Sequence, residues 1–370
     1  MLMKVLVTGA NGFVAKNLLI HLSERNDIEL FTFNRENSLS DLLTILTTVD
    51  FVFHLAGVNR PENDAEFIEG NVNLTQALCN AIEQSDNKIP ILYTSSIQAE
   101  LDNPYGRSKL NAERILQDYS NGTGARVYIF RLPNVFGKWS KPNYNSVVST
   151  FCYNIANDLP ITVNDPNSQV CLIHVDDVIK EFMAIMDGAP IDTVYCQINP
   201  VYETTVGELA KKITAYKHSR QTLVSERVGK GFERALYSTY LSYLKPNQFS
   251  YSVDKYDDER GVFIEMLKTK DSGQFSFFTA RPGITRGGHY HHTKTEKFLV
   301  IKGEALFRFR HIVTEEYYEL KTKADSPDIV ETVPGWAHDI TNIGDDEMIV
   351  MLWANEIFDR NNPDTYARKF

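Results

Sequence analysis

One glycine-containing turn near the start of the chain constrains the fold more than any other feature. The apolar run that ends at Val7 passes through Thr8-Gly-Ala-Asn-Gly12 directly into an amphipathic segment that begins at Phe13. A short β-branched run stopped by glycine is typical of a buried strand, and the periodicity that follows is typical of a helix. The first N–H groups and the positive dipole end of such a helix form an anion site. We therefore expect a strand, a phosphate-binding turn and a helix here.

The residues of this turn have distinct expected roles toward the pyrophosphate of a dinucleotide. Gly9 would permit the tight turn and Gly12 the close approach of the backbone to phosphate. Ala15 stands where the third glycine of the dinucleotide-binding pattern usually falls. Asn11 and Phe13 complete the segment that we expect to contact the cofactor.

The end of the next predicted strand, residues 28–33, indicates which dinucleotide would bind. This strand runs into Asn34-Arg35. An acidic residue at this point would bond the ribose 2′-hydroxyl of NAD, whereas an arginine can pair with the 2′-phosphate of NADP. Arg35 therefore favours NADP, and a surface arginine that binds no ligand is the alternative.

Strands and helices alternate through the first two thirds of the chain. Strands are predicted at 50–55, 89–94, 125–132 and 169–175, and helical segments at 66–83, 105–118 and 205–217 separate or follow them. This alternation predicts an α/β fold of Rossmann type, a doubly wound parallel sheet with helices on both faces. Sites on such a sheet collect at the carboxyl ends of its strands, where Leu55-Ala56-Gly57 and Ser95-Ser96 lie.

The sequence changes character from about residue 249. Helical periodicity fades, and short aromatic or β-branched runs follow at 261–267, 274–278, 297–301, 305–309, 317–320 and 348–353. Such a series predicts an all-β sandwich or small barrel. At 370 residues the chain exceeds one typical core. We expect two domains, residues 1–246 and 247–370, joined at Lys245-Pro-Asn247.

Composition argues against several classes of protein. A net charge of −10 without a basic stripe argues against a nucleic-acid partner. No apolar run approaches the roughly 20 residues that cross a bilayer, and the start reads as a strand rather than a secretory signal. Four cysteines lie far apart without paired spacing, which is typical of free thiols in a reducing compartment. We expect a cytoplasmic protein with no membrane partner. The cysteines are Cys79, Cys152, Cys171 and Cys196.

Three residues form a candidate catalytic set for reduction of a carbonyl. Tyr105 and Lys109 are four residues apart and therefore share one helical face. The ammonium would favour the phenolate and lower the tyrosine pKa from about 10. Lys109 could also hold the nicotinamide ribose, while Ser96 could bond the substrate carbonyl. Tyr105 would then supply a proton to the new alkoxide after hydride transfer.

This set, together with the glycine turn, Leu55-Ala-Gly57 and Ser95-Ser96 in this order, resembles the extended short-chain dehydrogenase/reductase family over roughly residues 1–245. The resemblance implies a Ser-Tyr-Lys triad, a bound NAD(P) and a nucleotide-sugar substrate. It implies Ser96 as the triad serine, because the serine of this family is usually the last of such a run. Only eight residues separate Ser96 from Tyr105, which is short for the family and keeps Ser95 as an alternative.

The same resemblance assigns three further positions. Asn71, in Gly70-Asn-Val-Asn-Leu74, falls on a helix position near the cofactor, beside Leu55, Ala56 and Gly57. Arg131 and Asn134, in Arg131-Leu-Pro-Asn134, fall on the substrate-side loop.

A second chemical centre is indicated by the histidines, five of nine of which lie beyond residue 285. In a strand, His289 and His291 point to the same face. A hairpin can bring Glu296 beside them, and a distant strand can add His338. Three imidazoles and one carboxylate suit a divalent ion such as zinc, with nickel or iron as alternatives. His292 is out of phase and is more simply a surface or supporting residue.

These residues resemble both motifs of the cupin family, a small β-barrel with a metal at its mouth. The first motif is Gly283-x₅-His289-x-His291-x₄-Glu296-x₆-Gly303. The second is Pro334-Gly-Trp-Ala-His338-x₃-Asn342, one residue shorter between proline and glycine than is usual in the family. The resemblance implies metal ligation by the three histidines and the glutamate.

An extended reductase followed by a cupin resembles bifunctional enzymes of capsular-polysaccharide synthesis, and residues 287–298 and 333–338 resemble that subfamily closely. The resemblance implies a UDP-linked 4-keto-6-deoxy-N-acetylhexosamine as substrate. The cupin would epimerise carbon 3, and the N-terminal domain would reduce the carbon-4 ketone with NADPH. The product would be UDP-N-acetyl-6-deoxy-L-talosamine, on the route to L-fucosamine.

The chemistry is coherent, because a ketone acidifies the neighbouring C–H and a divalent cation can stabilise the enolate. His292 and Lys294 are candidates for the base. A homodimer is expected, since cupin barrels often pair through strands. Two alternatives stay open: an NADP-dependent sugar reductase with a purely structural cupin, and a protein that senses NADP without turnover.

Overall fold

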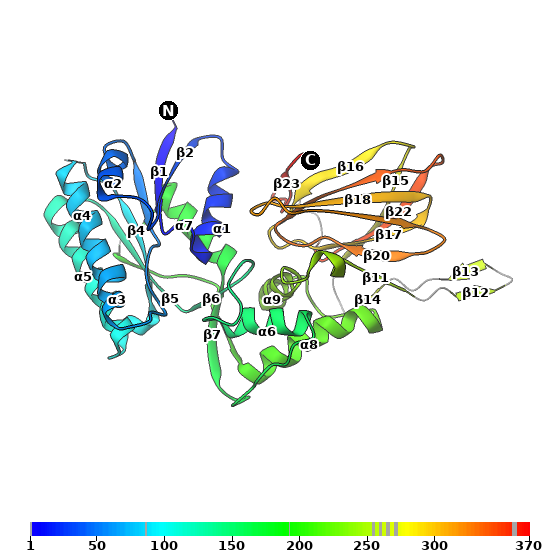
Figure 1. Cartoon of the computed structure of the whole chain (residues 1–370), viewed down its shortest axis with the longest axis horizontal. Coiled ribbons are helices and arrows are strands. Elements are labelled where there is room, and N and C mark those ends of the chain that lie inside the picture. The colour runs from blue at the N-terminus through cyan, green and yellow to red at the C-terminus, as the bar shows by residue number, and fades with distance from the viewer. Residues whose placement is uncertain are drawn as a thin grey trace. The chain divides into compact units, whose positions relative to one another are not determined.

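The computed structural model describes residues 2–85, 87–191, 193–253, 256–258, 261–263, 267–269, 273–356 and 361–370. The chain divides into two compact units (Figure 1). Unit 1 comprises Met1–Val135 and Cys171–Glu203, and unit 2 comprises Phe136–Val170 and Thr204–Phe370.

Unit 1 is built on a six-stranded sheet with the order β2-β1-β3-β4-β5-β8, and every pairing in it is parallel. Its strands are β1 (Met3–Thr8), β2 (Ile28–Phe33), β3 (Phe51–His54), β4 (Ile91–Ser96), β5 (Val127–Leu132) and β8 (Tyr195–Cys196). The helical elements are α1 (Phe13–Ser23), α2 (Leu39–Leu46), α3 (Ala65–Phe67), the π-helix η1 (Ile68–Asn73), α4 (Leu74–Gln84), the 3₁₀-helix η2 (Ile97–Glu100), α5 (Pro104–Thr123) and α7 (Val175–Met186).

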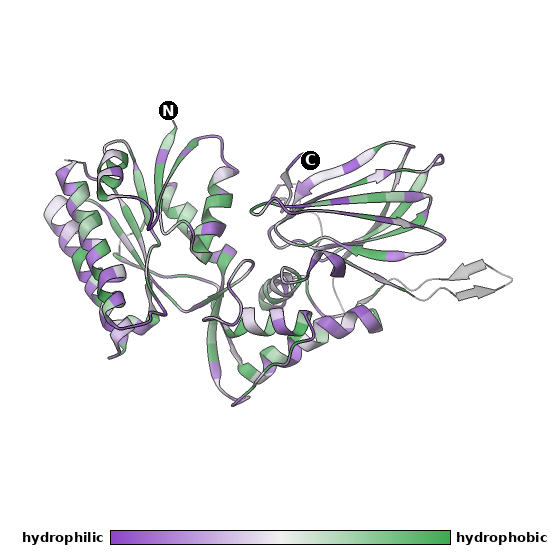
Figure 2. Ribbon diagram, in the orientation of Figure 1, coloured by the Kyte–Doolittle hydropathy of each residue, from purple (hydrophilic) through white to green (hydrophobic). Residues whose placement is uncertain are grey.

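Two hydrophobic cores cover the two faces of this sheet, because side chains alternate along each strand. Val5 and Val7 pack with residues of α1 and α7, whereas Leu6 packs with residues of α2, α4 and α5. Figure 2 shows the hydrophobic residues along these strands and on the helices beside them. The expected doubly wound α/β sheet is therefore confirmed. The expected helix at 66–83 is present as α3, η1 and α4 in succession.

Unit 2 combines three helices with two five-stranded sheets whose pairings are antiparallel. The helices are α6 (Val147–Ala156), α8 (Val206–Thr222) and α9 (Gly231–Leu241). One sheet has the order β11-β20-β17-β22-β15 and the other β19-β18-β21-β16-β23. Their strands are β11 (Ser250–Ser252), β15 (Gln274–Ala280), β16 (Thr285–Tyr290), β17 (Glu296–Lys302), β18 (Glu304–His311), β19 (Tyr317–Lys323), β20 (Asp328–Glu331), β21 (Trp336–Asn342), β22 (Met348–Ala354) and β23 (Tyr366–Ala367).

The inner faces of the two sheets pack together. Phe298 of β17 and Phe307 of β18 have ring centroids 5.6 Å apart, and both are buried. The expected all-β, barrel-like C-terminal fold is confirmed. Of the strand predicted at 261–267, residues 264–266 lie outside the described part of the chain.

The remaining elements are short. A three-stranded sheet has the order β6-β7-β9, and two further pairs are β10-β14 and β12-β13. Their bounds are β6 (Asn134–Phe136), β7 (Gln169–His174), β9 (Tyr202–Thr205), β10 (Val224–Ser225), β12 (Tyr256–Asp258), β13 (Gly261–Phe263) and β14 (Lys268–Thr269), and the 3₁₀-helix η3 is Pro246–Gln248.

The division into units differs from the domain boundary expected after residue 246. A buried ion-pair cluster within unit 2 joins its helices to its sheets: Glu331 of β20 pairs with Lys297 of β17 and lies 3.4 Å from Arg220 of α8. Residues 136–170 and 204–246 therefore group with the β-rich part. The domain boundary expected after residue 246 concerns which parts fold independently, and it stays a prediction.

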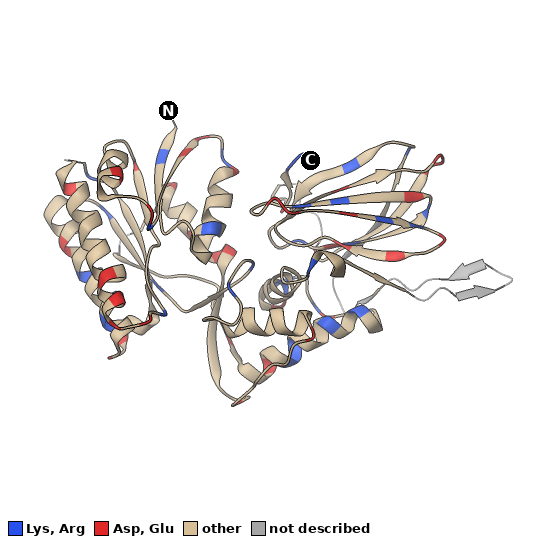
Figure 3. Ribbon diagram, in the orientation of Figure 1, with Lys and Arg blue, Asp and Glu red and all other residues tan. Residues whose placement is uncertain are grey.

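In the part of the chain that the structure describes, no helix is long and apolar enough to cross a bilayer. Basic and acidic residues are interspersed along the elements of both units (Figure 3). The four cysteines are free thiols, as expected.

Candidate active site and metal centre

The glycine turn lies where the strand order of the parallel sheet reverses, between β1 and β3, which is where such sheets bind ligands. Gly9 has a φ of +68°, and a Cβ there would lie 2.6 Å from the Cα of Ala56. Only glycine fits this turn without strain. Gly12 precedes α1, and no side chain caps that helix end within the described residues. The first N–H groups of α1 are therefore open to an anion, and their contact with a pyrophosphate stays a prediction.

The buried His54 connects the segments that surround this turn. His54 ends β3, and its Nδ1 lies 2.8 Å from Thr8 Oγ1 while its Nε2 lies 2.9 Å from Thr75 Oγ1. Thr8 Oγ1 also accepts a hydrogen bond from Ala56 N at 3.2 Å. Burial, with a smaller effect of the Lys109 charge, lowers the pKa of His54 to about 3. The neutral imidazole of His54 thus links β1, β3 and α4 next to the turn that is predicted to bind the cofactor.

Asn71 shapes the loop that follows β3. Its Oδ1 accepts from Val58 N at 2.8 Å, and its Nδ2 donates to Val58 O and to Ser108 Oγ, each at 2.9 Å. A Cβ on Gly57 would lie 2.8 Å from Asn71 Oδ1 and 3.1 Å from Lys109 Nζ. The structure therefore brings together three residues predicted to contact the cofactor, beside Leu55 and Ala56.

The candidate triad lies at the end of β4 and in the first two turns of α5. Asn103 caps α5 by accepting from Gly106 N at 2.8 Å, and Pro104 occupies the first turn, so Tyr105 and Lys109 follow on one face. The Ser96 side chain lies near the Tyr105 phenol, close enough to lower its pKa. The Ser95 hydroxyl instead donates to the buried carboxylate of Glu113. This arrangement supports Ser96 as the triad serine.

The pKa values within the triad are governed by burial. Burial raises the pKa of Tyr105, and the nearby Ser96 side chain opposes this shift. The net shift is therefore upward and not downward as we expected, because desolvation of the phenolate outweighs any effect of the Lys109 charge. Lys109 Nζ donates to Thr94 O at 3.0 Å and to Tyr93 OH at 3.3 Å. Burial lowers the pKa of Lys109 to about 8, although the Glu113 charge raises it.

Arg131, predicted to bind substrate, is held by an ion pair. Its Nε and Nη2 donate to the two oxygens of Glu113 at 3.0 and 2.6 Å, and its Nη1 donates to Glu100 at 2.9 Å. Glu113 is fully buried, so this pair fixes the end of β5 against α5. A substrate role for Arg131 stays a prediction.

Two other predicted residues lie at the surface of unit 1. Arg35 is exposed just after β2. The preceding Asn34 accepts a hydrogen bond through Oδ1 from Asn11 N in the glycine turn at 3.3 Å. Asn134 is exposed and donates to Cys171 O at 3.3 Å. Arg35 thus lies close in the fold to the predicted pyrophosphate site.

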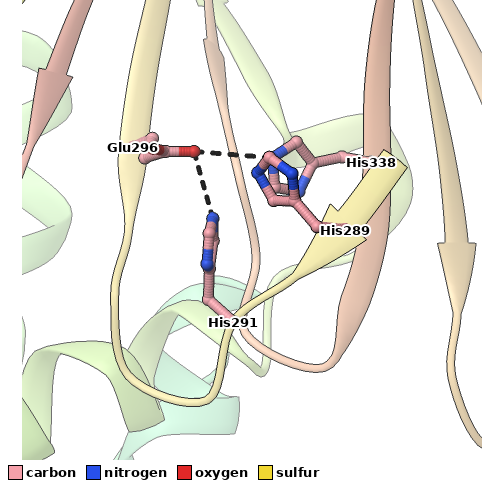
Figure 4. A group of neighbouring side chains, drawn as sticks. All are labelled: His289, His291, Glu296 and His338. Atoms are coloured by element: carbon pink, nitrogen blue, oxygen red, sulfur yellow. Dashed lines mark hydrogen bonds and ion pairs between the residues drawn. The ribbon is translucent and has the colours of Figure 1, made fainter. Parts of the chain in front are cut away.

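In unit 2, the four predicted metal ligands converge (Figure 4). His289 lies on β16, His291 just after it, Glu296 starts β17, and His338 lies on β21. One ligand atom from each side chain lies within 4.8 Å of all the others. Glu296 Oε2 is 3.1 Å from His291 Nε2 and 3.4 Å from His338 Nε2. His291, Glu296 and His338 are buried.

The protonation states of these residues fit a bound cation. His291 Nδ1 lies 2.5 Å from the carbonyl oxygen of Asp364, which can only accept, so this nitrogen carries the proton. Because the Glu296 carboxylate also only accepts, its contact with His291 Nε2 requires a second proton on that nitrogen. A metal ion between the two groups can replace this proton. His338 Nδ1 is buried without a hydrogen-bond partner among the described residues. Burial lowers the pKa of His289 to about 3 and also lowers that of His338, so both imidazoles are neutral.

Glu296 completes the donor set as a carboxylate. Burial alone would raise its pKa, but the hydrogen bond with His291 and the nearby His338 side chain hold the pKa well below its usual range. Three neutral imidazoles and one carboxylate fit zinc, and nickel or iron accept the same ligands.

The two candidate bases near this centre differ in position. Lys294 Nζ lies 3.0 Å from Glu296 Oε1 and is buried beside the ligands. The His292 ring packs edge-on against Tyr290 and Tyr366, with centroids 5.6 and 4.8 Å away. Lys294 is therefore the better placed of the two.

Sequence reasoning missed His54, Glu113 and Asp364. A histidine at the end of an apolar strand and a glutamate one turn after Lys109 were visible signals for the first two. No local pattern distinguishes Asp364, whose contacts come from residues about 70 positions earlier.

The fold and these sites define a class of protein. The chain belongs to the NAD dependent epimerase/dehydratase family, whose sequence pattern matches residues 5–195. The pattern of the polysaccharide biosynthesis C-terminal domain matches residues 256–366. Membership of the first family identifies the cofactor as a nicotinamide dinucleotide.

Individual proteins that resemble this chain are more specific than the family. The chain is 60% identical over 365 residues to UDP-2-acetamido-2,6-beta-L-arabino-hexul-4-ose reductase of Pseudomonas aeruginosa, covering 99% of this chain and 98% of that protein. It is similar to the crystal structure of capsular polysaccharide assembling protein CapF from Staphylococcus aureus, with 42% identity, full coverage of both chains and a TM-score of 0.69. UDP-glucuronic acid 4-epimerase from Bacillus cereus matches 58% of this chain and 84% of its own at 18% identity and a TM-score of 0.53, a likeness of fold alone.

Proposed function

We propose that this chain is a bifunctional enzyme of surface-polysaccharide precursor synthesis. The barrel-like part of unit 2 holds a divalent metal, with zinc as the expected ion, and epimerises UDP-2-acetamido-2,6-β-L-arabino-hexul-4-ose at carbon 3. Unit 1 then reduces the carbon-4 ketone of this epimer with NADPH to UDP-N-acetyl-6-deoxy-L-talosamine. The 60% identity to a reductase named for this substrate, over nearly the whole of both chains, supports the assignment.

The observation that carries the reductase proposal is that Ser96 at the end of β4 lies near Tyr105 of α5, with Lys109 buried one helical turn later. NADPH, when bound, supplies the hydride. Tyr105 is kept neutral by burial and can donate its phenolic proton to the oxygen at carbon 4. Ser96 hydrogen-bonds the same oxygen. The Lys109 ammonium stabilises the phenolate left on Tyr105.

The cofactor preference rests on Arg35. Its guanidinium is free to pair with a 2′-phosphate near the glycine turn, which NADPH carries and NADH lacks. Arg35→Asp is expected to lower kcat/KM for NADPH and to raise it for NADH. Arg114→Asp, at an exposed position on α5, makes the same charge change away from the turn and should leave the ratio unchanged. An unaltered ratio in Arg35→Asp would contradict the NADPH assignment.

The epimerase proposal rests on the convergence of His289, His291, Glu296 and His338. A divalent cation, when bound, supplies charge that stabilises an enolate oxygen. Lys294 is the proposed base for the proton on carbon 3, because it lies buried beside the ligand set. Its contact with Glu296 holds the amine next to the centre.

The two activities can be separated by isotope exchange. Substrate incubated in D₂O without NADPH should gain deuterium at carbon 3, detected by mass spectrometry. Tyr105→Phe should retain this exchange while losing reduction, and Glu296→Gln should lose the exchange. No exchange in the wild type would leave a reductase with a structural barrel, and unimpaired reduction in Tyr105→Phe would refute the triad.

We also propose that the protein is a homodimer that pairs through β15. This strand lies at the edge of its sheet. Phe275 and Phe277 on it are 49% and 69% exposed. An exposed apolar edge strand is a site of pairing with another chain.

A further inference from the structure

The last described residues of the chain, 361–370, lie along the segments that carry two of the four proposed metal ligands; we refer to them as the C-terminal strap. β23 of the strap pairs antiparallel with β16, with Ala367 opposite His289 and Tyr366 opposite Tyr290. Arg368 N donates to Gly288 O at 2.8 Å. The strap therefore extends the backbone ladder of the strand that presents His289.

One carboxylate of the strap organises the loop between His291 and Glu296. Asp364 accepts hydrogen bonds from the backbone N–H groups of His292, Thr293 and Lys294 at 2.8, 2.7 and 2.6 Å. It accepts another from the Thr293 hydroxyl at 3.0 Å. Four donors on one carboxylate fix the path of a loop that has no regular secondary structure.

The backbone carbonyl of Asp364 also contacts one of the proposed metal ligands, His291. The carbonyl oxygen of Asp364 lies 2.5 Å from His291 Nδ1. Because a carbonyl only accepts, this contact holds the proton on Nδ1 and leaves the Nε2 lone pair for the side on which Glu296 lies. Second contacts of this kind orient the imidazoles that ligate metals and set their tautomer.

The strap is anchored by contacts that need no metal. Arg368 Nη2 pairs with Glu315 at 2.7 Å. The ring of Phe370 lies under the guanidinium groups of Arg308 and Arg310, at 5.2 and 5.8 Å. Arg234 of α9 approaches Asp364 to 3.6 Å. These contacts hold Asp364 in place from several directions.

We propose that the C-terminal strap is a working part of the metal centre, with Asp364 as a positioning residue that presets the His291 tautomer and the loop 292–294. This inference deepens the metal centre of the proposed function and rests on it. Without the carboxylate, the loop and His291 sample other arrangements, and a bound ion is released faster. Loss of such a supporting contact typically weakens metal binding about 10- to 100-fold.

The test compares full-length wild type with Asp364→Asn, which keeps the side-chain shape but turns an amide NH₂ toward backbone donors. Both proteins are loaded with zinc, and the rate of zinc transfer to excess chelator is measured. Asp364→Asn should lose zinc about 10- to 100-fold faster. Asp345→Asn, at an exposed loop position, makes the same charge change and should behave as wild type.

A second readout needs no metal. In metal-free protein with ¹⁵N-labelled histidine, His291 Nδ1 should carry a proton in the wild type, and a smaller fraction of the molecules should carry it in Asp364→Asn. Equal zinc loss together with an unchanged His291 spectrum overturns the inference. A wild type that takes up no zinc refutes the proposed metal centre, while the spectra still decide whether Asp364 positions His291.

A second pair of variants keeps the test decisive if Asp364→Asn does not fold. Arg368→Pro removes the N–H that donates to Gly288, whereas Arg368→Ala keeps it, and both remove the ion pair with Glu315. Faster zinc loss in the proline variant than in the alanine variant supports the role of the strap, and equal rates contradict it.

Discussion

Burial of the Lys109 ammonium has a thermodynamic cost that a single substitution should reveal. The side chain is 5% exposed, and its pKa falls from an ordinary 10.5 to about 8. At about 1.4 kcal/mol for each pH unit, keeping this group charged at pH 7 destabilises the fold by about 3 kcal/mol. This cost is taken from the net pKa shift, so it already includes what the hydrogen bonds from Nζ to Thr94 O and Tyr93 OH contribute to the charged form. Lys109→Met should therefore be more stable than wild type at pH 7 by about 1 kcal/mol or more.

Lys109 should make the free energy of unfolding rise with pH, whereas a lysine in a favourable ion pair makes it fall. Between pH 8 and pH 10.5 the unfolded lysine is protonated while the folded one is neutral, so the unfolded state binds more protons. Raising the pH through this window stabilises the wild type. Relative to Lys109→Met, the wild-type free energy of unfolding should rise by about 2.5 kcal/mol between pH 7 and pH 10.

Urea unfolding followed by far-UV circular dichroism measures this difference. All three tryptophans (Trp139, Trp336 and Trp353) lie in unit 2, so their fluorescence transition reports a unit that lacks Lys109 and should not move. The exposed Lys180 gives the matched control, because Lys180→Met removes a lysine without removing a buried charge. A difference between wild type and Lys109→Met that is the same at pH 7 and pH 10 would refute the reasoning.

Four further predictions concern the reductase site, helix α5 and the proposed dimer. The rate of NADPH oxidation should fall above about pH 8 as Lys109 loses its proton. In Lys109→Arg, the activity that remains should fall only at a higher pH. A rate that stays constant up to pH 10 in the wild type would contradict this prediction. Gly9→Ala, at a φ of +68°, should cost about 2 kcal/mol or more and weaken NADPH binding measured by calorimetry. Gly122→Ala, with open space around it, should instead stabilise α5 by about 0.5–1 kcal/mol. Phe277→Glu should convert the proposed dimer to monomer in sedimentation experiments, and an unchanged mass would exclude the β15 interface.

Much of unit 1 could be predicted because its signals are local. The glycine turn places Gly9 and Gly12 between a strand and a helix, and parallel strands end at one edge of a sheet. Helical spacing then places Tyr105 and Lys109 on one face. The same applies to His289 and His291, whose alternation on a strand sends both imidazoles to one side.

Other properties could not be predicted because they depend on packing. The pKa of Tyr105 rises rather than falls, since burial of the phenol outweighs a nearby ammonium. Arg131 meets the buried carboxylate of Glu113 rather than standing free at the sheet edge. The grouping of residues 136–170 and 204–246 with the β-rich part follows from contacts such as that between Arg220 and Glu331.

By itself, the sequence determined the alternation of strands and helices, the anion-binding turn and the identity of the four side chains that converge in the barrel, because periodicity and spacing act over a few residues. Only the tertiary structure decided which nitrogen of His291 contacts the Asp364 carbonyl, that Ser95 and not Ser96 meets Glu113, and that Asp364 holds the loop beside the proposed metal centre. Those outcomes depend on burial and on contacts between residues far apart in the chain, and no local pattern carries them.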